Sequence, residues 1–202
     1  MTDHVAPHWD TSALVVIDMQ ADFTGIDGTP EVIEPVSALA EAFRRAGRPI
    51  VHIVRLYPAG SSDVDLPRRS LAGTMVAPGT AGSEIVAGLP VPTPLDPRLL
   101  LSGRPQGIGE DEIVLFKPRW GAFYRTELES WLRARGVDTV VVAGCNLPNC
   151  PRATLFEASE RDFRTVIVSD AVSRTSPERL ADLAGIGVNV LTAEAVVDSL
   201  SG

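Results

Sequence analysis

The sequence predicts an α/β protein, a three-layer α/β/α sandwich built around a mainly parallel sheet of about six strands. Short runs rich in valine and isoleucine recur along the chain without period-2 alternation, which is typical of strands buried on both faces. Helix-like stretches lie between most of these runs. Strands that alternate with helices are joined by right-handed crossovers and therefore lie parallel in one sheet.

The predicted strands are the short apolar runs themselves. They lie at residues 13–18 (ALVVID), 49–55 (PIVHIVR), 112–116 (EIVLF), 139–144 (TVVVAG), 165–170 (TVIVSD) and 188–191 (VNVL). Because neither face of such a strand is polar, helices are expected to cover both sides of the sheet.

The predicted helices occupy residues 31–47, 125–136, 150–163 and 176–187. The first two end in arginines followed by glycine, a pattern of helix C-termini. The third has Leu155 and Phe156 among the residues expected to face the core. The fourth starts with Ser176 before Pro177, an N-cap residue followed by a proline that suits the first helical position.

Residues 58–109 interrupt the alternation of strand and helix. They are rich in proline and glycine, but apolar pieces such as SEIVAGL punctuate them. We expect a long ordered excursion near the carboxyl ends of the strands, where open α/β sheets bind ligands. A chain of 202 residues is long enough for one sizeable domain, so a single domain over residues 1–202 is predicted.

Composition and charge exclude several classes of function. Hydrophobic residues make up 45% and charged residues 22%, as in ordinary globular proteins. The net charge of −8 provides no basic surface for nucleic acid or an anionic membrane. No apolar run approaches the roughly eighteen residues of a transmembrane helix. Residues 1–10 lack the layout of a signal peptide, so a cytoplasmic protein with two free thiols is expected.

Polar side chains follow the ends of four predicted strands. Asp18 ends the first, Arg55 the second, Lys117 follows the third, and Cys145 to Cys150 follow the fourth. Because the carboxyl ends of parallel strands meet at one edge of a sheet, these side chains are expected to converge. A proline after Cys150 places this thiol at or beside a helix start, where the helix N-terminus and a nearby cation would lower its pKa.

Each of these residues also has a purely structural interpretation. An aspartate at a strand end is commonly a turn residue, and a lysine there is commonly solvated. Cys145 is interpreted as a small buried hydrophobic residue. The two cysteines could form half of a zinc site, but His4, His8 and His52 show no paired spacing. No metal and no cofactor are therefore expected.

Three segments carry a resemblance to a known family. They are VVIDMQADF, PGTAGSEIV and FKPRWGAFYRTELESWLRARGVDTVVVAGCNLPNCPRATLFEASERDFRTVIVSDA, and they resemble the isochorismatase-like cysteine hydrolases. The likeness runs in register over about residues 13–191. It implies the same sandwich fold, assembly into homodimers or homotetramers, and three catalytic residues. By the resemblance Asp18 is the general base, Lys117 the family's lysine and Cys150 the nucleophile.

The resemblance also implies the shape of the loop before Cys150. A cis peptide bond is expected between Cys145 and Asn146, with the amides of Asn146 and Cys150 as the oxyanion hole. Many members have threonine in place of Asn146 and valine in place of Pro151, so this loop could be shaped differently here. The metal-binding Asp-x-His of the nicotinamidase branch is absent, and the isochorismatases proper lack the cysteine.

Together with these residues, the resemblance implies a hydrolase of a small-molecule C–N bond in an amide, ureido or N-carbamoyl compound, acting through a thioester. Cys150 would attack the carbonyl and Asp18 would shuttle the proton. The residues predicted to bind substrate are Phe23, Arg55, Trp120 and Phe123, with Arg55 as an anchor for an anionic group. Alternatively, the two phenylalanines belong to the core and Arg55 to a surface salt bridge.

Two other functions stay open at this point. The first is isochorismatase-type vinyl ether hydrolysis, with Asp18 as the acid and Cys150 incidental. The second is a non-enzymatic binding or redox module, with a reversible disulfide between Cys145 and Cys150. A nucleotide site is disfavoured because the glycine-containing segment GRPQGIG does not follow a strand. The expected partner is a small-molecule substrate, with no nucleic acid and no membrane.

Overall fold

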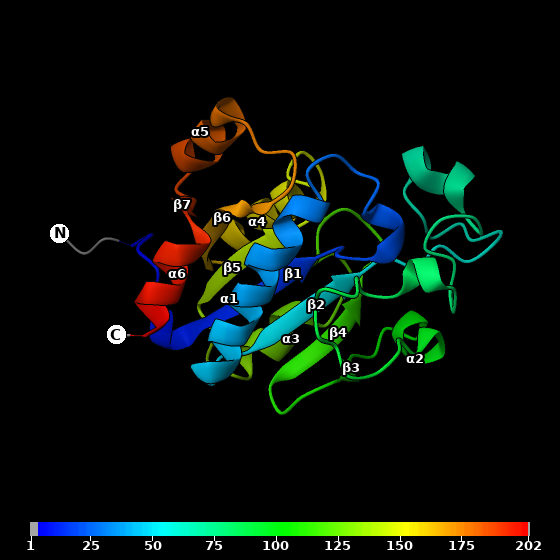
Figure 1. Ribbon diagram of the computed structural model, residues 1–202, viewed down its shortest axis with the longest axis horizontal. Helices are drawn as coiled ribbons and strands as arrows, with labels where there is room; N and C mark the ends of the chain where they lie inside the picture. Colours follow the sequence, from blue (N-terminus) through cyan, green and yellow to red (C-terminus); the bar gives the residue numbers. More distant parts are fainter. Residues whose placement is uncertain (1–3, 202) are drawn as a thin grey trace.

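The computed structural model describes residues 4–201 and has the predicted three layers (Figure 1). A seven-stranded sheet with the order β3-β4-β2-β1-β5-β6-β7 lies between two layers of helices. Neighbouring strands are parallel except β3 and β4, which are antiparallel. The predicted fold class is confirmed.

The elements of the sheet and of the helical layers have the following bounds. The strands are β1 (Ser12–Ile17), β2 (Ile50–Val54), β3 (Gln106–Gly107), β4 (Glu112–Phe116), β5 (Thr139–Gly144), β6 (Arg164–Val172) and β7 (Asn189–Leu191). The α-helices are α1 (Ile33–Arg45), α2 (Pro97–Leu101), α3 (Leu128–Arg133), α4 (Cys150–Ser159), α5 (Pro177–Gly185) and α6 (Ala193–Leu200). Short 3-10 helices lie at Trp9–Thr11, Ala21–Phe23, Pro30–Val32, Leu66–Leu71 and Ala81–Ser83.

The sheet has an apolar core on each face. Helices α3, α4 and α5 contribute Leu128, Leu155 and Leu183 to one core. Helices α1 and α6 contribute Phe43 and Val196 to the other. Side chains of a strand point alternately to the two faces, and all six residues of β1 are buried. Burial on both faces is the reason that the strands appear as continuous apolar runs.

One strand and two α-helices of the structure were not predicted. Strand β3 is only two residues long and has no apolar run, so the prediction of about six strands omitted it. Helix α2 has five residues and lies inside the segment predicted to be irregular. Helix α6 follows the last predicted strand and packs against α1. Strand β3 and helix α2 are too short to show a hydrophobic periodicity in the sequence.

The chain changes direction between the two central strands. From β1 it proceeds outward through β2 and β4, and then returns to the other side of β1 with β5, β6 and β7. The carboxyl ends of β1 and β5 lie close together, because Ile17 pairs with Gly144. A Cβ atom on Gly144, which has a φ of 113°, would collide with the backbone of Ile17. A reversal of strand order of this kind is where open α/β sheets bind ligands.

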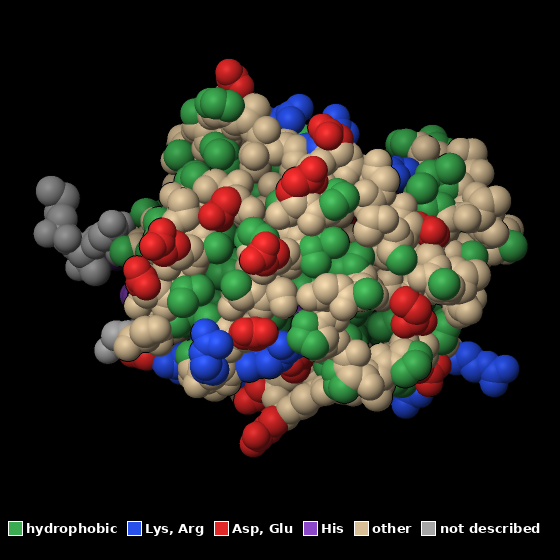
Figure 2. Space-filling view, in the orientation of Figure 1, with side chains coloured by type: hydrophobic (Ala, Val, Ile, Leu, Met, Phe, Trp, Pro, Cys, Tyr) green, Lys and Arg blue, Asp and Glu red, His purple; other side chains and the backbone are tan. Residues whose placement is uncertain are grey.

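The long excursion lies where the sequence predicts it. After β2 the chain passes beyond the carboxyl ends of the strands, at the right of Figure 1, before it returns through α2 and β3 to the edge of the sheet. On the face shown in Figure 2, acidic side chains are scattered among basic ones. None of the helices formed by residues 4–201 combines the length and the apolar character required to cross a membrane.

Candidate active site

Asp18, directly after β1, forms a buried ion pair with Lys117, directly after β4. Nζ of Lys117 donates a hydrogen bond to Oδ2 of Asp18 at 2.9 Å, and both side chains are buried. Asp18 has a φ of 52°, in the left-handed region that aspartate tolerates better than most residues. Within residues 4–201, Oδ1 of Asp18 has no hydrogen-bond partner. One oxygen of this carboxylate is therefore held and the other is available.

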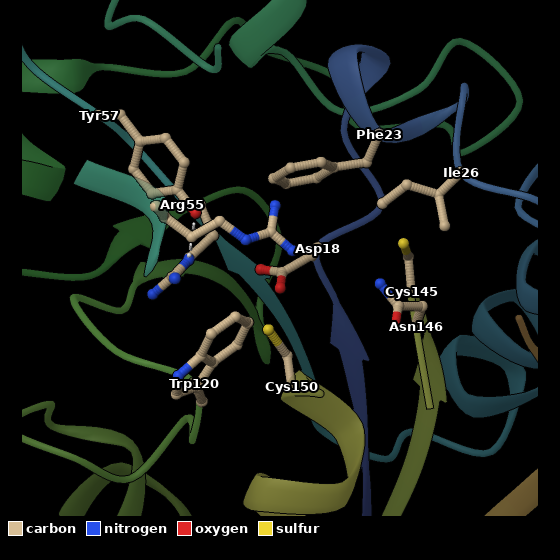
Figure 3. A pocket seen from close by; sticks show the side chains of 10 residues that line it. Asp18, Phe23, Ile26, Arg55, Tyr57, Trp120, Cys145, Asn146 and Cys150 are labelled. Carbon is tan, nitrogen blue, oxygen red and sulfur yellow. Dashed lines mark hydrogen bonds between the residues drawn. The ribbon is translucent and has the colours of Figure 1, made fainter. Parts of the chain in front are cut away.

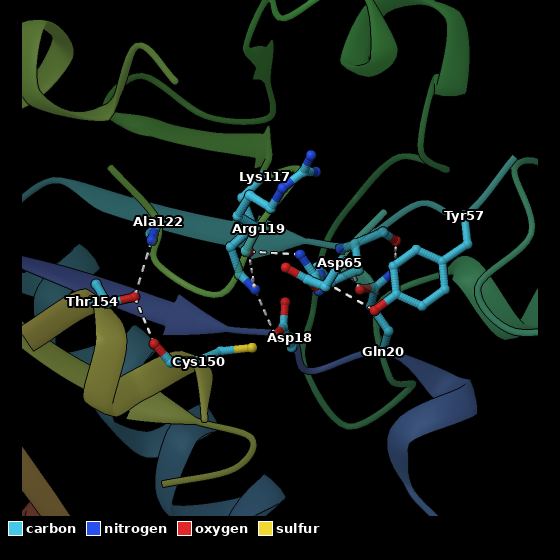
Figure 4. A network of polar contacts seen from close by, with 10 residues as sticks. Asp18, Gln20, Tyr57, Asp65, Lys117, Arg119, Ala122, Cys150 and Thr154 are labelled. Carbon is cyan, nitrogen blue, oxygen red and sulfur yellow. Dashed lines mark hydrogen bonds and ion pairs between the residues drawn. The ribbon is translucent and has the colours of Figure 1, made fainter. Parts of the chain in front are cut away.

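Cys150 is the first residue of α4, and its thiol lies beside the Asp18 carboxylate (Figures 3 and 4). The hydroxyl of Thr154, one turn further on, donates to the Cys150 carbonyl at 2.8 Å. The same hydroxyl accepts a hydrogen bond from the Ala122 N–H at 3.1 Å. The first turn of α4 is thus tied to the loop that follows Lys117, so that the thiol and the ion pair are held together.

Burial dominates the electrostatics of the Cys150 thiol. Burial raises the pKa of Cys150 to about 12, and the negative charge of Asp18 acts in the same direction. The positive charges of Lys117 and Arg55 lower the pKa but do not compensate. The expectation of a lowered thiol pKa is therefore corrected for the resting site. The thiol is neutral near pH 7, and a base must take its proton for it to act as a nucleophile.

The loop between β5 and α4 carries two backbone donors without a partner. The peptide bond between Cys145 and Asn146 is cis. In the described part of the chain, the N–H groups of Asn146 and Cys150 donate no hydrogen bond, whereas the intervening Leu147 N–H donates to the Ser173 carbonyl at 2.9 Å. Unpaired N–H groups at a helix start can stabilise a developing oxyanion.

Pro151 limits what the start of α4 can donate. It lies in the first turn of the helix and has no N–H. Asn149, the residue before the helix, makes no side-chain capping hydrogen bond. The Cys150 N–H precedes the proline and stays unpaired in the described chain. Pro151 stands where many family members have valine, and it leaves the Cys150 N–H available as a hydrogen-bond donor.

Cys145 has a different environment from Cys150. Its sulfur accepts a hydrogen bond from the Thr29 hydroxyl at 3.4 Å and lies toward Ile26 (Figure 3). Burial raises the pKa of Cys145 as well. Both cysteines are free thiols in the structure. Cys145 thus closes a buried strand, as its apolar context predicts.

A small pocket surrounds the Cys150 thiol. Its walls come from five separate parts of the chain and consist of Asp18, Phe23, Ile26, Arg55, Tyr57, Arg68, Trp120, Cys145, Asn146 and Cys150. Three of the four residues predicted to bind substrate, Phe23, Arg55 and Trp120, are among them (Figure 3). The cavity volume is about 10 Å³. This volume is on the scale of a single water molecule.

Phe123 does not line this pocket. It packs against Phe163 with ring centroids 5.5 Å apart, and the Arg161 guanidinium lies over its ring at 5.3 Å. Its N–H donates to the Glu157 carboxylate of α4 at 2.8 Å. The prediction that Phe123 binds substrate is corrected. The residue belongs to the core under α4, which was the alternative interpretation of it.

Arg55 lines the pocket (Figure 3), and each nitrogen of its guanidinium is hydrogen-bonded to another part of the protein. Its guanidinium donates to the Asp65 carboxylate, to the Arg119 carbonyl at 2.6 Å and to the Tyr57 hydroxyl at 3.1 Å. Only 1% of Arg55 is exposed. Burial opposes its charge, but negative charges nearby, that of Asp18 foremost, raise its pKa, so the guanidinium stays charged. Arg55 is therefore a buried ion-pair partner and not a surface residue.

Sequence reasoning missed several residues of the site. Gln20 holds the strand ends together, since its amide accepts from the Arg55 N–H at 2.7 Å and donates to the Arg55 carbonyl at 2.9 Å. Tyr57 follows β2 closely enough that its position at a strand end could have indicated it. Arg68 and Asp65 lie in the excursion, where no periodicity points to the pocket.

The described residues contain no group of three or more His, Cys, Asp or Glu side chains that could hold a metal ion. Around the Cys150 thiol, the candidate site therefore contains the Asp18 carboxylate, the cations Lys117, Arg55 and Arg68, and two backbone N–H groups that are unpaired in the described residues. Such an arrangement can move a proton from the thiol and stabilise an oxyanion.

Comparison with known proteins gives one family model. A model described as the isochorismatase domain matches residues 12–195. A protein of Arabidopsis thaliana named probable inactive nicotinamidase is 32% identical, over 93% of this chain and 95% of its own length. A ureidoacrylate amidohydrolase of Methylorubrum extorquens is 29% identical, over 86% of this chain and 74% of its own length.

A solved structure with similar architecture is that of N-carbamoylsarcosine amidase from Thermoplasma acidophilum. It superposes with a TM-score of 0.72 at 29% sequence identity and covers 91% of this chain and 97% of its own. The likeness thus extends over nearly the whole chain.

Proposed function

The chain belongs to the isochorismatase family of hydrolases, and from this premise we propose that it hydrolyses a C–N bond in a small amide, ureido or N-carbamoyl compound through a thioester on Cys150. The observation that carries the proposal is the Asp18 carboxylate, with Oδ2 held by Lys117 and Oδ1 unpaired in the described residues beside a buried thiol. A carboxylate that is fixed but not saturated can accept a proton.

In the first half of the proposed reaction, the Cys150 sulfur attacks the substrate carbonyl carbon as its proton passes to Asp18. The negative charge that develops on the carbonyl oxygen is stabilised by the N–H groups of Asn146 and Cys150. Asp18 then gives the proton to the leaving nitrogen, the C–N bond breaks, and ammonia or an amine departs. Lys117 keeps the carboxylate in place throughout.

In the second half, Asp18 takes a proton from a water molecule that attacks the thioester carbonyl. The C–S bond breaks, the acid product leaves, and the proton returns to the sulfur. The neutral resting thiol fits this cycle, because each turn begins and ends with the proton on Cys150. No step requires a metal or a cofactor.

The relatives support C–N chemistry more than the alternatives. The names of two of them, ureidoacrylate amidohydrolase and N-carbamoylsarcosine amidase, describe hydrolysis of ureido or carbamoyl nitrogen. Vinyl ether hydrolysis has no evident use for the buried Cys150 thiol at the pocket wall. For a redox module, the hydrogen bond from Thr29 to the Cys145 sulfur favours a structural role for that cysteine.

The direct test is a panel of small amides, ureas and N-carbamoyl compounds, with release of ammonia as the measurement. The proposal expects turnover of at least one compound and its loss in Cys150→Ala. Full activity of Cys150→Ala on that compound would contradict it. Release of pyruvate from isochorismate, undiminished in Cys150→Ala, would favour vinyl ether hydrolysis instead.

The proposal also covers the oligomeric state of the protein and its location in the cell. We expect a single hydrolase domain over residues 1–202 that forms a homodimer or homotetramer in the cytoplasm, with a small-molecule substrate as its partner. These features rest on the family resemblance and on the cysteine content. Light scattering of the purified protein measures the mass of the assembly, and a monomer at micromolar concentration would contradict the expected oligomer.

A further inference from the structure

Two arginines line the pocket, and they differ in what they bind. Each guanidinium nitrogen of Arg55 donates a hydrogen bond, to Asp65, Tyr57 or the Arg119 carbonyl. Arg68 is half-buried and, within residues 4–201, its side chain makes neither a hydrogen bond nor an ion pair. Its guanidinium lies 5.4 Å from the centroid of the Trp120 ring, a geometry that orients a guanidinium by cation–π attraction. An oriented and unpaired arginine at a pocket wall is a donor without an acceptor.

The ion pair between Arg55 and Asp65 holds Arg68 in position. Asp65, the partner of Arg55, immediately precedes the 3-10 helix Leu66–Leu71, and its carbonyl accepts a hydrogen bond from the Arg68 N–H at 2.8 Å. Asp65 is only 4% exposed, so the ion pair fixes this turn of the excursion against the end of β2. Arg68 thereby reaches the pocket from a segment about 50 residues away from Lys117 and Asp18 in sequence.

The charges around the pocket do not balance. Lys117, Arg55 and Arg68 contribute three positive charges, and Asp18 and Asp65 contribute two negative ones. The excess of one positive charge lies on Arg68, because the other two cations are in ion pairs. A half-buried charge of this kind is stabilised by an anion that enters the pocket.

We propose that Arg68 binds a carboxylate of the substrate, so that the enzyme acts on small amides or ureido compounds that carry one carboxylate group. The guanidinium presents two parallel N–H groups to the carboxylate, a match that lysine does not reproduce. Trp120 supports the back of the guanidinium, and the substrate carbonyl then lies toward Cys150. This inference rests on the proposed function for the identity of the reaction, but not for the anion site itself.

Alkylation of Cys150 tests the anion site without knowledge of the substrate. Iodoacetate and iodoacetamide differ by a carboxylate in place of a neutral amide, and mass spectrometry of the Cys150 peptide gives the rate for each. We expect the ratio of the iodoacetate rate to the iodoacetamide rate to exceed that of free glutathione. Arg68→Gln should lower this ratio by about tenfold, the size of one charge-assisted hydrogen bond.

Two variants control for other effects. Arg69→Gln removes the same charge from the adjacent residue, which is exposed and donates to the Ser62 carbonyl, and it should leave the ratio unchanged. Arg68→Lys keeps the charge without the two-pronged contact and should give an intermediate ratio. If the variant merely opens the pocket, both reagents accelerate together and the ratio stays the same. An unchanged ratio in Arg68→Gln, or an equal fall in Arg69→Gln, would overturn the assignment.

A matched pair of possible substrates separates this inference from the proposed function. N-carbamoyl-β-alanine carries a carboxylate, and propylurea is its neutral counterpart. Arg68→Gln should raise KM for the acid and leave KM for the neutral compound unchanged. A fall in the alkylation ratio without turnover of any amide or urea would sustain the anion site and refute the hydrolase. Turnover of neutral compounds alone, with an unchanged alkylation ratio in Arg68→Gln, would sustain the hydrolase and refute the anion site.

Discussion

Two buried carboxylates at opposite ends of the sheet show how the same kind of group serves different purposes. Asp18 follows β1 at the carboxyl end, and Glu112 begins β4 at the amino end. Both oxygens of Glu112 are paired: Oε2 with Nε of Arg44 at 2.7 Å, and Oε1 with Nη2 of Arg44 and Nε2 of His52, each at 2.6 Å. In the described chain Asp18 has one oxygen paired and one unpaired.

The difference lies in what surrounds each carboxylate. Burial by itself would raise the pKa of Glu112, but the hydrogen bonds from Arg44 and His52 lower it to about 2. A saturated carboxylate of this kind stabilises the fold, whereas one with an open oxygen beside a thiol can exchange a proton. We therefore expect substitutions at the carboxyl end of the sheet to lower kcat, and substitutions at its amino end to lower the free energy of unfolding.

The largest effect is expected for Cys150→Ala. Loss of the nucleophile should lower kcat by about 10⁴-fold or more, because the remaining groups can only bind and polarise the substrate. Ammonia release measures the rate, and circular dichroism checks that the fold is retained. Cys145→Ala serves as the matched comparison and should cost far less. Similar losses in the two variants would remove the distinction between the two cysteines.

Asp18→Asn should lower kcat by about 10³-fold, since asparagine preserves the shape of the side chain but cannot accept the thiol proton. Single-turnover measurement of thioester formation locates the defect in the first chemical step. Asp22→Asn is the control, because Asp22 lies four residues further along the chain and its carboxylate accepts a hydrogen bond from the Val76 N–H at 2.6 Å. Normal thioester formation in Asp18→Asn would show that another group takes the proton.

Glu112→Gln should reduce stability while leaving kcat nearly unchanged. The folded-state pKa of about 2 lies below the ordinary value of 4.5, so the ionised carboxylate stabilises the fold above pH 4.5 by about 3 kcal/mol. This contribution disappears as the pH falls from about 4.5 through 2. Urea unfolding of the wild type and the variant across this range should give a difference that shrinks toward low pH. A constant difference would indicate that packing, and not charge, stabilises the cluster.

The smallest effect concerns the alkaline side of the pH profile. Because the pKa of Cys150 is raised to about 12, kcat/KM should change by less than about twofold between pH 7 and 9. A thiolate formed by loss of the proton to solvent before the attack would instead make kcat/KM rise about tenfold per pH unit across this range, because the range lies below the Cys150 pKa of about 12. The profile of ammonia release therefore shows whether the thiol loses its proton during the attack or in a separate step before it.

Much of the architecture was predictable because burial on both faces leaves a simple mark in the sequence. The predicted strand at residues 139–144 coincides with β5, and the predicted helix at 176–187 begins with the same Ser176 cap that accepts the Arg179 N–H. The elements that escaped prediction are the two-residue β3, the five-residue α2 and the terminal α6. Phe156, expected to face the core, is 41% exposed.

The sequence by itself determined which chemical groups are present at the strand ends and therefore that Asp18, Lys117 and Cys150 could meet. Only the tertiary structure decided how strongly each group is desolvated and which charge neutralises which. Burial turned a thiol expected to be acidic into one with a raised pKa, and Asp65 took the charge of Arg55 while Arg68 stayed unpaired within the described chain. Desolvation and ion pairing depend on three-dimensional neighbours, and the sequence order of an irregular excursion does not specify them.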